Sequence, residues 1–230
     1  MATRRRVSNP LALAVLGCLA ERPMHPYEIS TTLRSRGKEQ SIKLNYGSLY
    51  SVVESLVKHG LIRAQATVRE GRRPERTVYE ITEAGTAEFE EWLAELLSTP
   101  VRDFTSLEAG LSLMPGLPPD EVARLLEDRA VKLRIELGAI EAGEAVSAEI
   151  GLPELLTIEG RYRHAILTAE LDFVLDLAKR IRTAKLGGTK LWRRIHELRA
   201  EGVPFEEITA DPVGYLGEEA RVLAPPSAGQ

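Results

Sequence analysis

The chain has 230 residues, 43% of them hydrophobic, which suffices for one large or two ordinary folded domains, and no apolar run is long enough to predict a membrane-spanning helix. Its one cysteine, Cys18, excludes an intrachain disulfide and, among apolar neighbours, is expected to be a buried, inert thiol in a reducing cytoplasm. The net charge of −4 is unevenly divided: residues 1–80 carry 14 Lys and Arg against 7 Asp and Glu, whereas residues 81–230 carry 16 against 27, so the first part is the candidate for binding nucleic acid.

The first predicted helix spans about Pro10–Ala20. Ser8 or Asn9 suits its N-cap, because a short polar side chain accepts a free backbone N–H, and Pro10 suits its first turn. Basic residues ahead of an apolar run also resemble a signal peptide. Because the run fits a capped helix equally well, we expect no secretion. The residues expected to face inward are Leu11, Val15, Cys18 and Leu19.

A second helix is predicted at about Pro26–Arg36, and a third begins near Asn45, which can act as its N-cap. The third helix has an apolar stripe at helical spacing, formed by Leu49, Val52, Val53, Leu56 and Val57. Its opposite face is small and polar, which permits close approach to phosphates and base edges. For this helix alone an ordinary solvated face remains the better explanation. The candidate DNA contacts are Lys43, Asn45, Tyr46, Ser48, Tyr50, Ser51 and Lys58.

A β-hairpin is predicted directly after the third helix. Residues 61–68 alternate with period two, placing Ile62, Ala64, Ala66 and Val68 on one side, and Thr77–Thr82 alternate likewise. Gly71 and Pro74 suit the turn between them. Four arginines crowd this turn, and their planar guanidinium groups suit phosphate oxygens. Because the turn follows a candidate recognition helix, its charge favours contact with DNA over a merely solvated turn. The candidate contacts are Arg69, Arg72, Arg73 and Arg76.

Three motifs then carry a family resemblance: LALAVLGCLAERPMHPYEI, LNYGSLYSVVESLVKHGLI and REGRRPERTVYEITEAG, in this order over roughly Leu11–Leu97. They resemble the winged-helix domain of PadR-like transcriptional regulators. Pro26 stands where that family often has glycine. The resemblance implies a homodimeric repressor that binds an inverted-repeat operator and is often released by a ligand or stress signal.

A fourth helix is predicted after Thr82, with an apolar stripe formed by Phe89, Trp92, Leu93, Leu96 and Leu97. It is longer than a minimal winged domain needs, so the stripe can pack on the second region or on a partner chain. Trp92 and Trp192 could line an apolar effector pocket, although a core role is the commoner one for tryptophan. Trp92 is thus a weak effector candidate, and the effector itself is not identified.

Beyond Thr99-Pro100 the sequence predicts a short helix around Phe104–Leu113 and two long ones, at about Pro119–Ala148 and Pro153–Lys185. The stripes of two long helices would pair as an antiparallel hairpin and present apolar surface to a second subunit. A monomeric helical domain with a private core is the alternative. The dimerisation candidates are Leu133, Leu137, Ile140, Tyr162, Ile166, Phe173 and Leu177.

After Gly187-Gly188 another helix is predicted at Thr189–Ala200, and the remainder has mixed signals, with APPSAGQ expected to be disordered. The predicted fold class is therefore mainly α with a small β-hairpin wing. It comprises a winged helix-turn-helix domain at 1–99, a long-helix dimerisation domain at 100–186, and a short helix with a partly disordered extension at 187–230.

Two other classes of function are weighed against a DNA-binding regulator. An enzyme is disfavoured because no phosphate-binding, nucleophile-elbow or zinc-protease motif is present, and the four histidines do not fall in a metal-ligand pattern. No cofactor or metal is expected. A winged helix used only for protein contact is the remaining alternative, and the arginine-rich turn argues against it. The expected partners are operator DNA, a second copy of the chain and a possible small-molecule effector.

Overall fold

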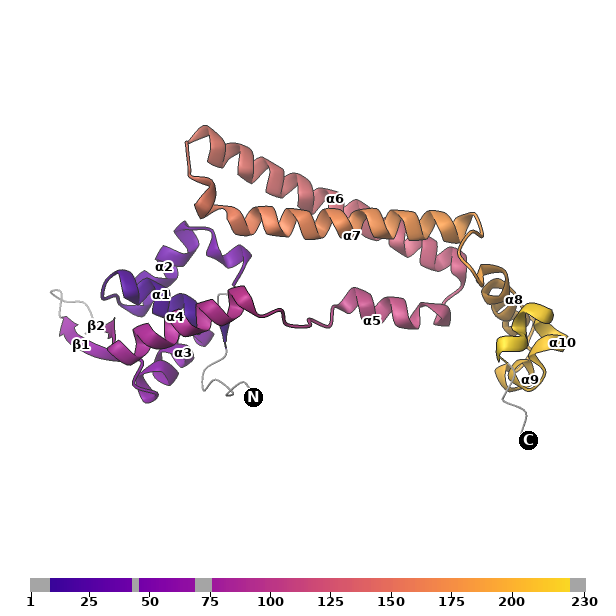
Figure 1. The fold of residues 1–230 in the computed structure, drawn as a ribbon, viewed down its shortest axis with the longest axis horizontal. Coiled ribbons are helices and arrows are strands. Elements are labelled where there is room, and N and C mark those ends of the chain that lie inside the picture. Colours follow the sequence, from indigo (N-terminus) through magenta and orange to yellow (C-terminus); the bar gives the residue numbers. More distant parts are fainter. Residues whose placement is uncertain (1–8, 43–45, 69–75, 224–230) are drawn as a thin grey trace. The chain divides into compact units, whose positions relative to one another are not determined.

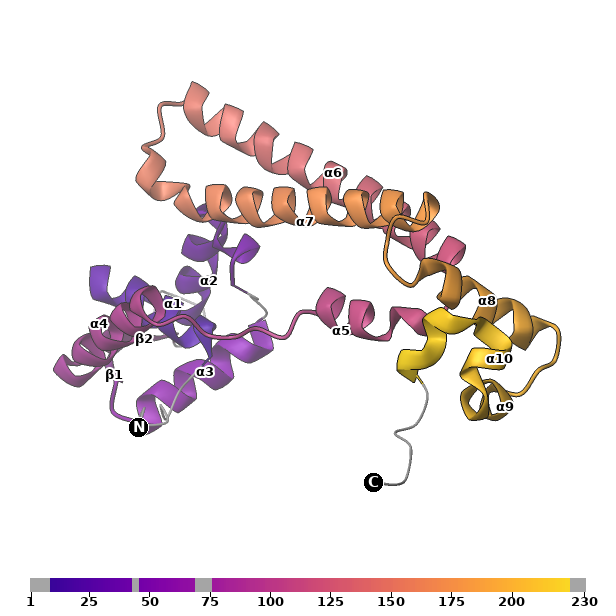
Figure 2. The same cartoon turned by 45° about the vertical axis from the view of Figure 1, so that its right-hand side comes forward.

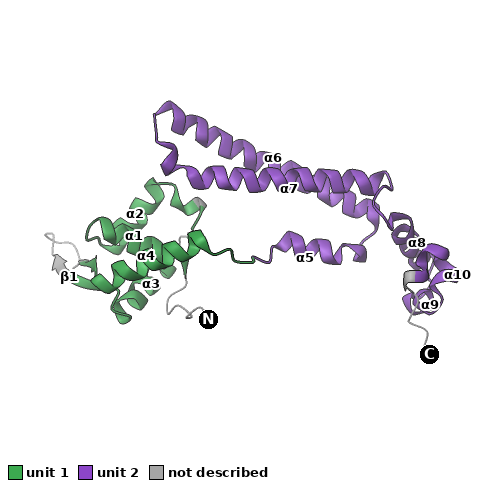
Figure 3. Cartoon of the chain, in the orientation of Figure 1, with its two compact units in different colours: residues 1–102 green, residues 103–230 purple. Residues whose placement is uncertain are grey.

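The computed structural model describes residues 9–42, 46–68 and 76–223, and the chain divides into two compact units, Met1–Arg102 and Asp103–Gln230 (Figure 3). The described residues are mainly helical, with one two-stranded antiparallel sheet (Figure 1). The predicted mainly α class with a β-hairpin is thereby confirmed. Among these residues, no helix combines the length and the apolar character that a membrane span requires.

The first unit runs helix, helix, helix, strand, strand, helix. Its elements are α1 (Pro10–Glu21), α2 (Pro26–Ser35), the 3₁₀ turn η1 (Lys38–Gln40), α3 (Tyr46–Lys58), β1 (Ile62–Val68), β2 (Arg76–Ile81) and α4 (Glu83–Ser98). This is the order expected of a winged helix-turn-helix, and the element bounds agree with the predictions to within a few residues.

Polar caps define the helix starts in this unit. Asn9, one of the two predicted caps, accepts the N–H of Leu11 through Oδ1 at 3.0 Å, and Thr82 Oγ1 accepts the N–H of Gly85 at 3.0 Å. The cap of α2 is His25, whose Nδ1 accepts the N–H of Tyr27 at 3.0 Å. A reciprocal bond runs from the His25 backbone N–H to Glu28 at 2.8 Å, which completes a capping box.

The core of the first unit is formed by one face each of α1, α2 and α3, closed by the hairpin and by Trp92 of α4. The predicted inward residues of α1 are all buried. The hairpin is tied to the helices by a two-way backbone pairing of Met24 with Tyr79, both bonds measuring 3.0 Å. This pairing fixes the base of the wing against the start of α2.

The hairpin departs from the strict alternation predicted for residues 61–68. Ala64 pairs with Tyr79 and Ala66 pairs with Val78, so Gln65 is an extra residue in β1. A bulge of this kind interrupts period two and increases strand twist. The alternation predicted for residues 61–68 was therefore wrong beyond Ala64; before the bulge, Ile62 is buried and Ala64 is exposed.

The second unit is built on a long antiparallel helical hairpin (Figures 1 and 2). Ion pairs cross it: Arg129 contacts Glu170 at 2.6 Å, and Arg182 contacts Glu127 at 3.0 Å. The elements are α5 (Ser106–Leu113), η2 (Met114–Gly116), α6 (Pro119–Glu149), η3 (Glu154–Leu156), α7 (Ile158–Arg182), α8 (Thr189–Ala200), α9 (Phe205–Ala210), α10 (Pro212–Leu216) and η4 (Glu218–Leu223). The predicted pairing of two long helices within one chain is confirmed.

Of the dimerisation candidates predicted on α7, only Leu177 lies on the buried face of this helix. Val174, Ala178 and Ile181 are buried against α6, whereas Tyr162, Ile166 and Phe173 are exposed at 71%, 51% and 51%. The helix is apolar on two adjacent faces, and α6 covers only one of them. The second apolar face is left on the surface of the unit.

After α7, α8 spans the predicted Thr189–Ala200, and α9 and α10 form where the sequence had mixed signals. Trp192 of α8 is buried, and its indole N–H donates to the backbone oxygen of Leu117 at 2.8 Å. Arg193 pairs with Asp120 at 3.1 Å. Asp211 caps α10, accepting the Gly214 N–H at 2.9 Å. Residues 224–230, which the sequence predicts to be disordered, lie outside the described part.

Candidate nucleic-acid interface

The candidate recognition helix is α3, preceded by α2 and the short turn η1. Leu49, Val52, Val53 and Leu56 are at most 7% exposed, so the predicted apolar stripe faces the core. Val57, at the edge of the stripe, is 42% exposed. Burial of this stripe orients the helix, and its polar face is therefore presented to solvent.

The exposed face of α3 carries small and hydroxyl-bearing side chains. Gly47 and Ser51 are exposed, Ser48 is half-buried, and Tyr50 is 47% exposed. Ser51 Oγ donates to the backbone oxygen of Gly47 at 3.2 Å, which keeps the hydroxyl close to the helix surface. The small residues Gly47, Ser48 and Ser51 leave room for a duplex to approach this part of the helix closely.

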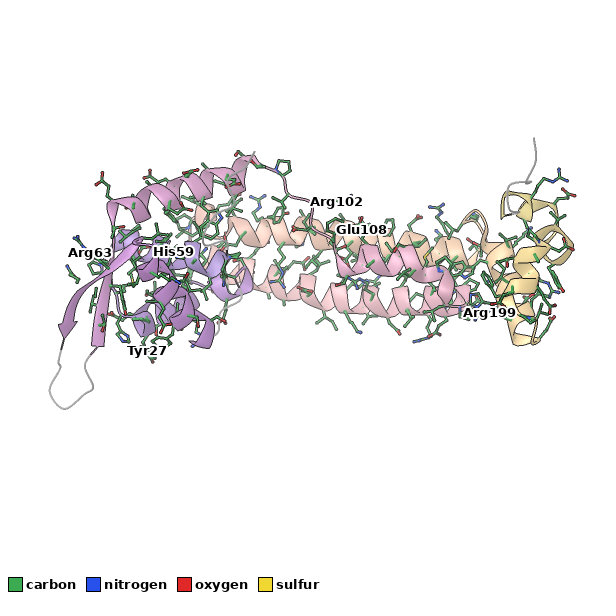
Figure 4. All side chains as sticks on the ribbon, turned by 90° about the horizontal axis from the view of Figure 1, so that it is seen from below. Tyr27, His59, Arg63, Arg102, Glu108 and Arg199 are labelled. Carbon is green, nitrogen blue, oxygen red and sulfur yellow. The ribbon has the colours of Figure 1, made fainter. Side chains whose placement is uncertain are left out.

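Charge on this face is mixed at the end of the helix. Lys58 is exposed and available to a phosphate, but Glu54 is also exposed and would repel one. The Nδ1–H of His59 donates to the backbone oxygen of Ser55 at 2.7 Å (Figure 4). His59 thus caps the carboxyl end of α3.

The wing follows α3 directly through Gly60 and Leu61. Arg63 of β1 pairs with Glu80 of β2 at 2.6 Å, across the strands, so this arginine is already engaged (Figure 4). Arg76 begins β2. Five of the predicted DNA contacts lie outside the described residues: Lys43, Asn45, Arg69, Arg72 and Arg73. Tyr46 begins α3, and the side chains of Tyr46 and Arg76 also lie outside that part.

One further candidate contact was not among the predicted ones. Tyr27 occupies the first turn of α2 and is 55% exposed (Figure 4). In a helix-turn-helix the helix before the recognition helix crosses the DNA backbone, and a tyrosine hydroxyl can donate to a phosphate. Its position at the start of the helix that precedes the predicted recognition helix was the available sequence signal.

An ion pair supports this end of the unit. The two guanidinium nitrogens of Arg36, after α2, donate to the carboxylate of Glu21 at the end of α1, at 2.5 and 2.7 Å. These hydrogen bonds lower the pKa of Glu21. The pair is largely exposed, so its contribution to stability is small, of the order of 0.5 kcal/mol.

The other candidate residues occupy distinct environments. Trp92, the weak effector candidate, is 5% exposed in the core of the first unit. Of the dimerisation candidates, Leu133, Leu137 and Leu177 are buried within their own chain, Ile140 is half-buried, and the exposed ones are Tyr162, Ile166 and Phe173. Within the part of the chain that the structure describes, no group of three His, Cys, Asp or Glu side chains could hold a metal ion.

These features define a winged-helix protein, and a comparison with known families bears on its first unit. Residues 15–91 match the model of the Transcriptional regulator PadR-like family. The first unit of this chain is thus a PadR-like domain, as the motifs predicted. No curated protein matches the chain.

Solved structures share the fold at low sequence identity. PadR of Bacillus subtilis in complex with operator DNA is 18% identical with a TM-score of 0.58, covering 74% of this chain and 99% of its own. The Vibrio cholerae virulence activator AphA is 17% identical with a TM-score of 0.58, covering 76% and 99%. Bacillus subtilis PadR in complex with p-coumaric acid is 18% identical with a TM-score of 0.52, covering 71% and 98%. The family and the fold together support a DNA-binding transcription regulator.

Proposed function

We propose that this protein is a sequence-specific, homodimeric transcriptional repressor that binds an inverted-repeat operator in the cytoplasm and responds to a small molecule or stress signal. The observation that carries the DNA-binding part is the PadR-like domain itself, in which a small polar helix face stands next to a hairpin with an arginine-rich turn. The structure of PadR with operator DNA supports this reading for the shared fold.

In this proposal α3 enters a major groove. Ser48, Tyr50 and Ser51 contact phosphates and base edges, while Lys43, Asn45, Tyr46 and Lys58 hold the ends of the helix against the backbone. Arg69, Arg72, Arg73 and Arg76 hold flanking phosphates or an adjacent minor groove. Specificity resides in the helix, and affinity that depends on salt resides in the turn of the hairpin.

The homodimer is supported by the uncovered apolar face of α7. Ile158, Tyr162, Ile166 and Phe173 recur at helical spacing and are at least 51% exposed. A monomer seldom leaves such a stripe in water, and a two-fold partner would bury it against its own copy. A dimer would place two copies of α3 in successive major grooves, about 34–36 Å apart.

Repression and induction are the finer part of the proposal. A bound dimer blocks access to the promoter. An effector that changes the angle between the two winged domains would prevent the two copies of α3 from fitting both half-sites at once. The complex of Bacillus subtilis PadR with p-coumaric acid supports a small-molecule signal in this fold. Because AphA is named an activator, a reporter assay with and without the protein decides the direction of regulation.

A titration of the protein with the DNA upstream of its own gene tests the proposal. We expect tight binding that survives a scrambled competitor, with two protomers bound per site. Equal, weak binding to both duplexes would remove sequence specificity from the proposal. If no binding occurs even at low salt, the DNA function fails and a protein-interaction module is the better account.

The arginines of the turn are tested by Arg72→Ala/Arg73→Ala. Since each phosphate contact contributes about 0.9 to the slope of log affinity against log salt, the double variant should weaken binding to every sequence and flatten the slope by about two. Fluorescence anisotropy over 50–300 mM salt measures this. The matched control is Lys132→Ala/Arg134→Ala, which removes two exposed cations from α6. An unchanged slope in the arginine variant would mean that the turn of the hairpin does not contact DNA.

A further inference from the structure

The sequence pattern places the chain's basic character in the first 80 residues, but a second basic segment lies near the other end. Residues 179–199 contain eight Lys and Arg and a single acidic residue, Glu197. These eight are half of the 16 Lys and Arg in residues 81–230, which otherwise carry a large excess of Asp and Glu. The segment spans the end of α7, the Gly187-Gly188 link and α8.

The acidic residues nearby neutralise only part of this charge. Arg182 pairs with Glu127, Arg193 pairs with Asp120, and Arg194 pairs with Glu197 and Glu201. Lys179, Lys185 and Lys190 are exposed and pair with no carboxylate among the residues that the structure describes. Arg180 is only loosely paired, because the carboxylate of Asp176 lies 3.7 Å from its guanidinium group.

The unpaired cations gather where the chain turns from α7 into α8. The N–H of Lys185 donates to the backbone oxygen of Arg180 at 2.8 Å, so the link folds back onto the end of α7. Lys185 and Lys190 line one surface hollow, together with Gly187, Gly188 and one acid, Glu219. We call Lys179, Arg180, Lys185 and Lys190 the basic corner.

Helix stability accounts for only part of the corner. Lys179 and Arg180 lie in the last turn of α7, where the helix dipole favours cations. Lys190 lies in the first turn of α8, where the dipole disfavours a cation and where no acidic residue is present. Lys185 belongs to neither helix. The last two lysines therefore add positive charge to the corner without a compensating gain in local stability.

We propose that the basic corner is a second, sequence-independent contact to duplex DNA, outside the winged-helix domain. The proposal rests on the proposed DNA-binding function, which it deepens by adding phosphate contacts from the second unit. An anionic partner is required by the charge, and phosphates need only cations at the surface. A protein partner is disfavoured because the neighbouring apolar residues Leu186 and Leu191 are half-buried, and no exposed aromatic side chain is part of the corner.

The test is a salt series with the full chain and a duplex carrying the upstream region, comparing Lys185→Gln/Lys190→Gln with the matched control Lys132→Gln/Arg134→Gln. Both variants lose two exposed cations from the second unit. If the corner contacts DNA, its variant alone flattens the slope of log affinity against log salt by about two. Its affinity deficit should then be about tenfold larger at 50 mM than at 200 mM salt.

The outcomes separate this inference from the proposed function. If the slope is unchanged, or changes equally in the control, the proposed DNA contact of the basic corner is wrong, while the DNA binding proposed for the winged-helix domain stands. An acidic protein would then be the better candidate partner for the basic corner. A wild-type protein that binds no DNA at low salt overturns the proposed function first. Because Lys190 opposes the helix dipole, the variant should unfold at a midpoint no lower than that of the wild type, so that a change in slope reflects lost contacts with DNA.

Discussion

Ser51 is the described residue at which contact with DNA is most sharply testable. It is exposed on α3, and its hydroxyl bonds to the backbone of its own helix, so among the described residues it has no other partner to lose. Ser51→Glu would place a carboxylate where the proposal puts phosphates, and we expect operator affinity to fall more than tenfold with an unchanged unfolding midpoint.

Ser112→Glu is the matched control for that substitution. Ser112 is likewise exposed on a helix, and its Oγ donates to the backbone oxygen of Ala109 at 2.8 Å. Both variants add one negative charge, but only one lies on the candidate interface. Anisotropy titrations that give the same affinity for the two variants would contradict the assignment of α3 as the recognition helix.

Cys18 yields a prediction about reactivity. Its side chain is 2% exposed in α1, and burial raises the pKa of its thiol. A raised pKa leaves less thiolate at a given pH, so modification by a disulfide reagent at pH 8 should be at least tenfold slower in the native protein than in urea, and should speed up as pH rises. Rapid labelling of the native chain would indicate that α1 opens readily, and would revive a redox role.

At the scale of elements, the contact between α4 and the hairpin depends on one glycine. A Cβ at Gly85 would lie 2.0 Å from the backbone oxygen of Leu61 and 2.8 Å from Ile81 Cγ1. Neither the backbone nor the strand can give way cheaply, so Gly85→Ala should destabilise the first unit by about 2–3 kcal/mol. Urea unfolding followed by Trp92 fluorescence, in a Trp192→Phe background, measures this loss.

Gly110→Ala in α5 provides the comparison, because a Cβ there meets nothing within 4 Å. In a helix interior, alanine is favoured over glycine by up to about 1 kcal/mol, so this variant should be neutral or slightly more stable. A Gly85 variant as stable as the Gly110 variant would mean that α4 does not pack on the hairpin at the observed distance.

At the scale of the whole molecule, the proposed dimer predicts an effect on mass and on DNA binding together. Ile166→Asp/Phe173→Asp places two charges on the uncovered face of α7, at residues that the chain's own core does not use. The protein should then sediment as a 25.4 kDa monomer, and operator affinity should fall about a hundredfold, because half-sites are no longer bound together.

Ser112→Asp/Thr209→Asp adds the same charge elsewhere on the second unit, at two exposed positions, and should leave mass and affinity unchanged. If the α7 variant stays dimeric, the interface lies on another apolar surface. The exposed end of α4 would then be the first place to look, since Leu93, Leu96 and Leu97 are 38%, 51% and 81% exposed.

The sequence by itself determined most of the elements and the PadR-like character of the first unit. Caps such as Asn9 and Thr82, the helical spacing in α3 and α7, and the three PadR-like motifs depend on residues close along the chain, and their physics is local. Tertiary structure alone decided which of the two apolar faces of α7 packs on α6, where β1 bulges, and how α8 docks on Leu117. Each of these depends on a partner far away in sequence. An apolar stripe or strand shows which residues can be buried, but the element that packs against it decides which of them are buried.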